Sequence, residues 1–119
     1  MNSPCVFCEI VVGRSNAEIL AYMRDSVVLV PLNPVVDGHV IVISKLHCAD
    51  AFYIPSKFGI TAEDAASWAK HQSDPRYKSV NFITSVGIPA TQSINHLHIH
   101  IVPRQTGDGL MLPWTNQKV

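Results

Sequence analysis

The sequence has no excess of charge of either sign and no apolar run long enough to cross a membrane. Nine lysine and arginine residues balance nine aspartate and glutamate residues, and no basic run is present that would neutralise many phosphates of a long nucleic acid. The longest apolar runs fall far short of the ~20 residues of a membrane span, and no signal-peptide pattern is recognisable. These absences disfavour membranes and long nucleic acids as partners, although not a single nucleotide, and they make the cytoplasm the expected location.

Cysteine is also scarce. The three cysteines cannot all pair, and two of them form the run Cys5-Val6-Phe7-Cys8. In a reducing compartment such a pair is more often a metal or redox site than a disulfide. By itself it is half of a tetrahedral zinc site, and a redox motif or two reduced core cysteines are alternatives. The sequence offers two further ligands, His47 and one of the three histidines at 96, 98 and 100.

The length and the 47% share of hydrophobic residues suit one domain, spanning 1–119. A helix is predicted over 61–71, where Thr61 and Asp64 resemble a capping box and alanines share one face. Stretches rich in β-branched residues and bounded by turn residues predict short strands at 9–12, 18–23, 26–32, 39–44, 79–86 and 94–102. The expected fold class is therefore α+β, with a mainly antiparallel sheet.

Half of the six histidines stand at alternate positions, as His96, His98 and His100. Alternate side chains of a strand share one face at ~6.6–7 Å spacing, so the imidazoles would form a row while the intervening leucine and isoleucine pack on the other face. A buried imidazole needs hydrogen-bond partners, which makes three of them a costly way to fill a core. The row therefore indicates nucleophilic, proton-transfer or metal chemistry near neutral pH.

The run 96–102, His-Leu-His-Ile-His-Ile-Val, resembles the signature of the histidine triad (HIT) superfamily of nucleotidyl hydrolases and transferases. Supporting pieces lie in the family's order, namely the Cys-x-x-Cys pair, the segment from Asn33 to His47, and the segment 87–93. The resemblance covers most of the chain but not roughly residues 50–76. It implies a HIT-like fold with a five-stranded, mainly antiparallel sheet and one or two helices, joined to a second copy in a homodimer, with the tail 110–114 suited to reach the partner's site.

The resemblance also implies an activity. His98 would attack the α-phosphorus of a purine nucleoside phosphoramidate or a related conjugate, forming a covalent nucleotidyl-histidine that water hydrolyses. His100 would contact the phosphate and manage the proton of the leaving group, and Gln92 and Ser93 would donate hydrogen bonds to phosphate oxygens. His39 would support the nucleophile, although a core role is nearly as well founded.

The zinc-containing branch of the family implies a closed structural site of Cys5, Cys8, His47 and His96. Such a site has no open position, so its metal would not activate water.

Departures from the family pattern concern the substrate rather than the nucleophile. Pro31 stands where many relatives carry a residue that grips the ribose, and Asn33 is near enough in sequence to replace it. Thr91 replaces a usual glycine before Gln92. Three other functions are alternatives: hydrolysis of dinucleoside polyphosphates, a non-catalytic nucleotide-binding module with structural zinc, and a catalytic metal site formed by the histidine row itself.

Overall fold

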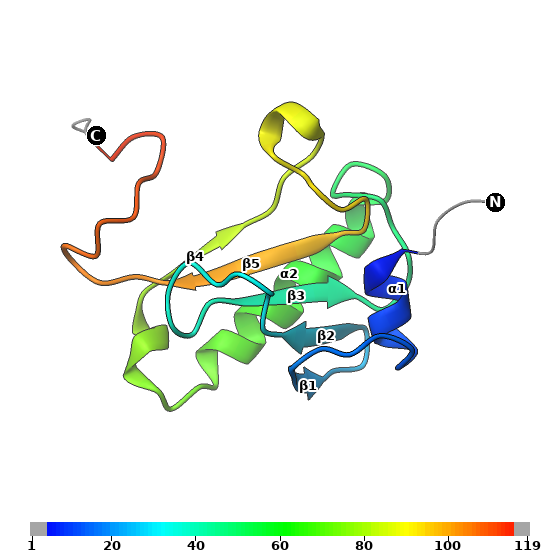
Figure 1. The fold of residues 1–119 in the computed structure, drawn as a ribbon, viewed down its shortest axis with the longest axis horizontal. Helices are drawn as coiled ribbons and strands as arrows, with labels where there is room; N and C mark the ends of the chain where they lie inside the picture. The colour runs from blue at the N-terminus through cyan, green and yellow to red at the C-terminus, as the bar shows by residue number, and fades with distance from the viewer. Residues whose placement is uncertain (1–4, 116–119) are drawn as a thin grey trace.

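The structure, a computed structural model that describes residues 5–115, is organised by a five-stranded antiparallel sheet (Figure 1). Its strands occur in the order β1-β2-β3-β5-β4. They are β1 Ile19–Tyr22, β2 Ser26–Leu29, β3 Val40–Ser44, β4 Val80–Ile83 and β5 His98–Pro103. The predicted α+β class with a mainly antiparallel sheet is confirmed.

The strand registers sort the side chains between two faces. His98 of β5 lies opposite Ile43 of β3, and His100 lies opposite Ile41. Because side chains alternate along a strand, these four residues share one face, whereas Ile99 and Ile101 point to the other. We call the first the histidine face.

Helix α2, Pro55–Lys70, covers the other face, where Ala65 and Ala69 are buried against β3 and β5. The helix begins six residues earlier than predicted because Pro55 occupies its first turn, where a missing N–H costs nothing. The predicted capping box at Thr61 and Asp64 is wrong. Thr61 lies inside the helix and donates to the Lys57 carbonyl, and Asp64 accepts a hydrogen bond from Ser26.

A short helix, α1 Val6–Val11, lies on the histidine face, so the predicted strand at 9–12 is wrong. Phe7 and Ile10, three positions apart, are both buried there against β2 and β3. A short apolar run fits either a strand or a helix, and here the burial of this pair decides for the helix. Two single 3₁₀ turns, η1 Pro75–Lys78 and η2 Ile88–Ala90, complete the regular structure.

The strand predicted at 94–102 begins only at His98. Before it the chain is irregular, because the Leu97 N–H bonds to the carbonyl of Cys48 and the His96 N–H to that of Ile94. His96 therefore leaves the row that simple alternation predicts, and its ring is completely buried. Among the described residues, no helix is long and apolar enough to cross a membrane.

Candidate functional site

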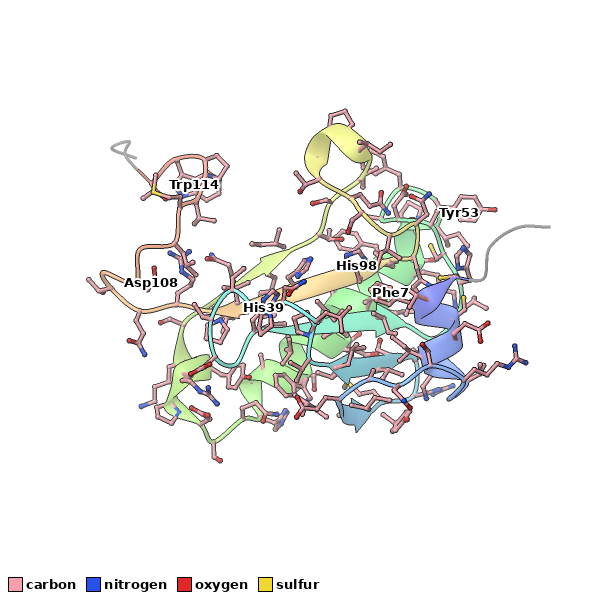
Figure 2. The ribbon with its side chains drawn as sticks, viewed as in Figure 1. Phe7, His39, Tyr53, His98, Asp108 and Trp114 are labelled. Carbon is pink, nitrogen blue, oxygen red and sulfur yellow. The ribbon has the colours of Figure 1, made fainter. Side chains whose placement is uncertain are left out.

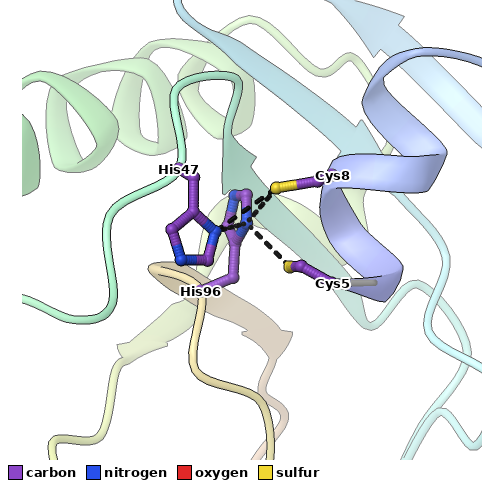
Figure 3. Close-up of side chains that lie close together, drawn as sticks. All are labelled: Cys5, Cys8, His47 and His96. Atoms are coloured by element: carbon purple, nitrogen blue, oxygen red, sulfur yellow. Dashed lines mark hydrogen bonds between the residues drawn. The ribbon is translucent and has the colours of Figure 1, made fainter. Parts of the chain in front are cut away.

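Four side chains from three distant segments of the chain meet at one end of the sheet (Figure 3). Cys5 precedes α1, Cys8 lies in α1, His47 follows β3 and His96 precedes β5. One ligand atom of each lies within 4.8 Å of all the others. The predicted ligand set is thus brought together, and it could hold a metal ion.

The separations fit tetrahedral coordination. The His96 Nδ1 lies 3.2 Å from the Cys5 Sγ, 3.5 Å from the Cys8 Sγ and 3.2 Å from the His47 Nδ1. Metal–sulfur and metal–nitrogen bonds of zinc length place tetrahedral ligands about 3.3–3.6 Å apart. The Nε2 of His96 lies 2.6 Å from the Ser44 carbonyl and must donate to it, which leaves the Nδ1 lone pair free for a metal.

The pKa of the Cys8 thiol determines how a metal would bind here. Burial raises the pKa of Cys8 to about 11, and the nearby Cys5 adds to the effect. A thiol with so high a pKa stays protonated unless a cation is bound, because a metal replaces the proton. Metal binding is therefore expected to release a proton and weaken in acid.

His98 sits next to this cluster, and its nitrogens have different tasks. Its Nδ1 lies 2.7 Å from the His96 carbonyl, which can only accept, so Nδ1 carries the proton. The Nε2 lone pair is then left free, as a nucleophile requires. Phe7 packs edge-on against the same ring, with centroids 5.1 Å apart. Sequence reasoning missed Phe7, whose one signal was its position inside the Cys-x-x-Cys run.

A hydrogen-bond relay defines the tautomer of His100. The Val35 N–H donates to the Nδ1 of His39 at 3.0 Å, so the His39 Nε2 carries a proton. This Nε2 lies 2.9 Å from the His100 Nδ1 and donates to it. The His100 Nε2 therefore carries the remaining proton and presents an N–H beside the nucleophile, since the rings of His98 and His100 are 5.2 Å apart.

Both relay histidines remain neutral at physiological pH. Burial, with smaller contributions from His98 and His39, lowers the pKa of His100 to about 4. Burial also lowers the pKa of His39. In this neutral form His100 presents its Nε2–H as a hydrogen-bond donor.

Acid is expected to destabilise the protein through His100. The unfolded ring binds a proton below its ordinary pKa of 6.5, whereas the folded ring does so only at about 4. Between these values the unfolded state binds more protons, so stability falls as the pH is lowered. Because the ring is partly exposed to solvent, we expect about 1 kcal/mol less stability at pH 5 than at pH 7 from this residue. Urea unfolding of His100→Gln should show a smaller loss than the wild type, and an equal loss would contradict the assignment.

Gln92 and Ser93, the two residues predicted to contact phosphate, lie in the loop 87–93 and differ in exposure. Gln92 is buried, and its amide is used inside the protein: Nε2 donates to the carbonyls of Ala49 and Ile94, and Oε1 accepts from the Gly87 N–H. Ser93 is exposed. Gln92 thus holds the loop together, while the Ser93 hydroxyl is accessible to a ligand.

Asn33 lies in the loop between β2 and β3 and is exposed. It stands two residues before Val35, whose N–H starts the histidine relay. Asn33 is therefore close to this relay in sequence. The structure shows no hydrogen bond between its side chain and the histidines.

Thr91 has a φ of 71°, in the left-handed region that a β-branched residue rarely adopts. Replacement by glycine removes this conformational cost of about 1–2 kcal/mol and loses part of it again to backbone entropy. We expect Thr91→Gly to raise the free energy of unfolding by about 0.5–1 kcal/mol, measured by urea denaturation. Destabilisation by this substitution would show that the hydroxyl matters more than the backbone.

Comparison with known proteins agrees with the geometry. A family model described as "HIT domain" matches residues 12–107. An uncharacterized HIT-like protein of Mycoplasma genitalium is 31% identical over 90% of this chain and 78% of its own length. The adenosine 5'-monophosphoramidase HNT1 of Saccharomyces cerevisiae is 28% identical over 99% of this chain and 74% of its own.

A solved structure provides a further match. A zinc-bound histidine triad family protein from Mycobacterium smegmatis aligns with a TM-score of 0.80 and 30% identity, covering 91% of this chain and 80% of that one. The family model spans well over half of the sequence and includes all of the histidine strand. With its neighbouring His98 and His100 on a five-stranded sheet, this chain belongs to the HIT-domain family.

Proposed function

We propose that the protein hydrolyses purine nucleoside phosphoramidates, or related nucleotide conjugates, through a covalent nucleotidyl-histidine at His98. The carrying observation is the hydrogen bond from His98 Nδ1 to the His96 carbonyl, which leaves Nε2 free to attack. The printed activity of the yeast relative, an adenosine 5'-monophosphoramidase, supports this substrate class.

The first step forms a bond between His98 Nε2 and the α-phosphorus and breaks the bond from phosphorus to the leaving nitrogen. A substrate already protonated on that nitrogen releases a neutral amine, which departs with the electron pair of the broken bond. His98 becomes a positively charged nucleotidyl-imidazolium. Its Nδ1 proton stays directed at the His96 carbonyl, whose dipole stabilises the new charge.

The second step reverses the first with water in place of the amine. Water attacks the phosphorus, the bond to Nε2 breaks, and its electron pair returns to the ring as the water gives up a proton to solvent. The His100 N–H and the Ser93 hydroxyl donate to phosphate oxygens in both steps. We assign support roles to His39, which orients His100, and to Gln92, which shapes the loop, and we keep Asn33 as the candidate contact to the ribose.

We also propose that the Cys5, Cys8, His47 and His96 cluster holds a structural zinc ion. Two thiolates and two imidazoles are a donor set that zinc favours, and all four positions come from the protein. A similar protein, the relative from Mycobacterium smegmatis, is zinc-bound. When bound, the ion supplies a rigid link between α1 and the segment before β5.

The family resemblance further supports a cytoplasmic homodimer, which we propose here. Strand β4 lies at the edge of the sheet, and Phe82 on it is 48% exposed. An edge strand with an exposed aromatic side chain is a ready surface for pairing with a second copy. Sedimentation equilibrium should then give twice the 13.1 kDa of one chain, and a monomer mass would contradict the proposal.

The activity is tested by incubating the wild-type protein with adenosine 5'-phosphoramidate. We expect release of AMP. When the reaction is stopped rapidly without acid, we also expect to recover an adenylylated protein whose modified peptide contains His98. Absence of both AMP release and adduct would contradict the proposed reaction. Binding of AMP without turnover would favour the non-catalytic module instead.

A further inference from the structure

A single tyrosine holds the turn that leads into β3. Tyr77 lies in η1, and its hydroxyl donates to the carbonyl of Gly38 at 2.6 Å, across 39 positions of sequence. Gly38 is followed directly by His39, which Figure 2 shows at the end of the loop 30–39, beside the strand that carries His98. The hydrogen bond of Tyr77 therefore ends one residue away from the histidine relay.

Tyr77 is itself fixed on the side of the sheet that α2 covers. Its ring packs against the core of that side and meets Trp68 of α2 edge-on, with ring centroids 5.2 Å apart. Burial raises the pKa of Tyr77, so the hydroxyl keeps its proton at neutral pH and can donate to a carbonyl, which only accepts. The donor is thus held in place independently of the loop that it contacts.

The turn at Gly38 fits tightly against its neighbours. Gly38 has a φ of 89°, in the left-handed region that favours glycine. A Cβ atom at this position would lie 3.2 Å from both the Tyr77 Oη and the Pro103 Cγ. Even one methyl group would therefore push the turn away from η1 and from the end of β5.

The same turn makes the contacts that set the histidine relay. The His39 N–H donates to the Val36 carbonyl at 3.1 Å, and the Val35 N–H donates to the His39 Nδ1 at 3.0 Å. Gly38 lies inside both of these closed turns. A shift of Gly38 separates the partners, and a neutral imidazole without a fixed partner exchanges its proton between its two nitrogens.

We propose that Tyr77 is a positioning residue, which holds the Gly38 carbonyl and thereby keeps the rings of His39 and His100 in the single tautomer that presents the His100 N–H to phosphate. Among the described residues, no hydrogen bond joins Tyr77 to a histidine, so it acts through the turn. The effect on turnover rests on the hydrolysis proposed at His98, whereas the effect on the tautomers does not.

The first test observes the histidine rings directly. Tyr77→Phe removes the hydroxyl but keeps the ring beside Trp68. In long-range proton–nitrogen NMR spectra, we expect the wild type to show both relay histidines protonated on Nε2 alone, and Tyr77→Phe to show an exchange-averaged mixture of tautomers. Tyr22→Phe on β1, where Tyr22 is 64% exposed, is the matched control and should give the wild-type spectrum. Unchanged tautomers in Tyr77→Phe would overturn the proposal, whatever its effect on stability.

Gly38→Ala disturbs the same contact from the side of the loop. Its methyl group meets the Tyr77 hydroxyl, so we expect the same mixture of tautomers with Tyr77 intact. Gly13→Ala is the control, because Gly13 has a similar φ of 80° but no atom within 4 Å of an added Cβ. A single tautomer in Gly38→Ala would show that the turn does not control the relay and would also overturn the proposal.

The second test separates positioning from folding in the kinetics. With adenosine 5'-phosphoramidate, we expect Tyr77→Phe to lower kcat about tenfold and to change KM less than twofold, because a displaced N–H donor costs most in the transition state. Since Tyr77 acts through His39, the double variant with His39→Gln should be no slower than His39→Gln alone. A wild-type kcat in Tyr77→Phe, or losses that multiply in the double variant, would contradict the proposal. If the wild type turns over no substrate, the hydrolysis is wrong and the NMR comparison still decides the role of Tyr77.

Discussion

Replacing His98 by asparagine is expected to lower kcat for AMP release from adenosine 5'-phosphoramidate by at least about 10³-fold. Asparagine keeps an N–H that can donate to the His96 carbonyl, as the Nδ1 of His98 does, but it has no nucleophilic nitrogen. The fold should therefore persist while the covalent step is lost. Initial rates and mass spectrometry of the quenched protein measure both effects.

A matched control is available in the same chain. His71 directly follows α2 and is exposed, with its Nδ1 beside the carbonyl of Ser67. His71→Asn removes a histidine from the other side of the sheet and should change the rate by less than twofold. Retention of wild-type activity by His98→Asn would contradict the assignment of the nucleophile. Equal losses in both variants would point to a general effect on the preparation rather than to the site.

Disruption of the proposed zinc site is expected to have the largest effect on stability. Cys5→Ser takes away one thiolate of the four-residue cluster, and we expect zinc content to fall from about one per chain to near zero. Because metal binding free energy becomes folding free energy, the free energy of unfolding should fall by about 2–5 kcal/mol. Elemental analysis and urea denaturation measure the two quantities.

The effect should reach the nucleophile through one residue. The side chain of His96 belongs to the metal cluster, and its carbonyl accepts the proton of the His98 Nδ1. Without a metal the His96 ring keeps its bond to the Ser44 carbonyl but loses its link to the two thiols and His47, so we expect kcat to fall as well. Excess zinc should not raise the activity of the wild type, because a closed site offers no position to substrate.

Cys48→Ala provides the comparison for a cysteine outside the cluster. Cys48 is completely buried, next to His47 in sequence, and packs with Ala51 and Leu97. This variant should lose stability through packing but keep one zinc per chain. If Cys5→Ser retained the metal, or if Cys48→Ala lost it, the proposed ligand set would be wrong.

The candidate nucleophile and metal ligands could be predicted from the sequence because each is marked by a local pattern of residues. Alternation with period two places His98 and His100 on one face of any strand that contains them, whatever the strand packs against. The Cys-x-x-Cys spacing of Cys5 and Cys8 likewise marks a candidate metal or redox pair without any knowledge of the fold. The residues themselves offered His47 and one histidine of the row as further candidate ligands, the family resemblance singled out His96, and the structure brings all four together.

Local patterns failed where contacts distant in sequence competed with them. Residues 9–12 have strand-like composition but belong to a helix, since Phe7 and Ile10 are buried against the sheet. His96 has the spacing of the row but leaves it, because its ring bonds to Ser44 and to the cluster, as much as 91 positions away.

The protonation pattern was decided by the tertiary structure alone. The amide N–H of Val35 and the carbonyls of Ser44 and His96 determine the tautomers of His39, His96 and His98. These contacts are made by backbone atoms, which a pattern of residue types does not describe. The same holds for the tyrosine contact that holds the turn before β3, whose partners are 39 positions apart. Sequence alone thus identified the candidate reactive groups. The folded chain determined which nitrogen carries each proton and what lies beside it, because both depend on partners that only folding brings near.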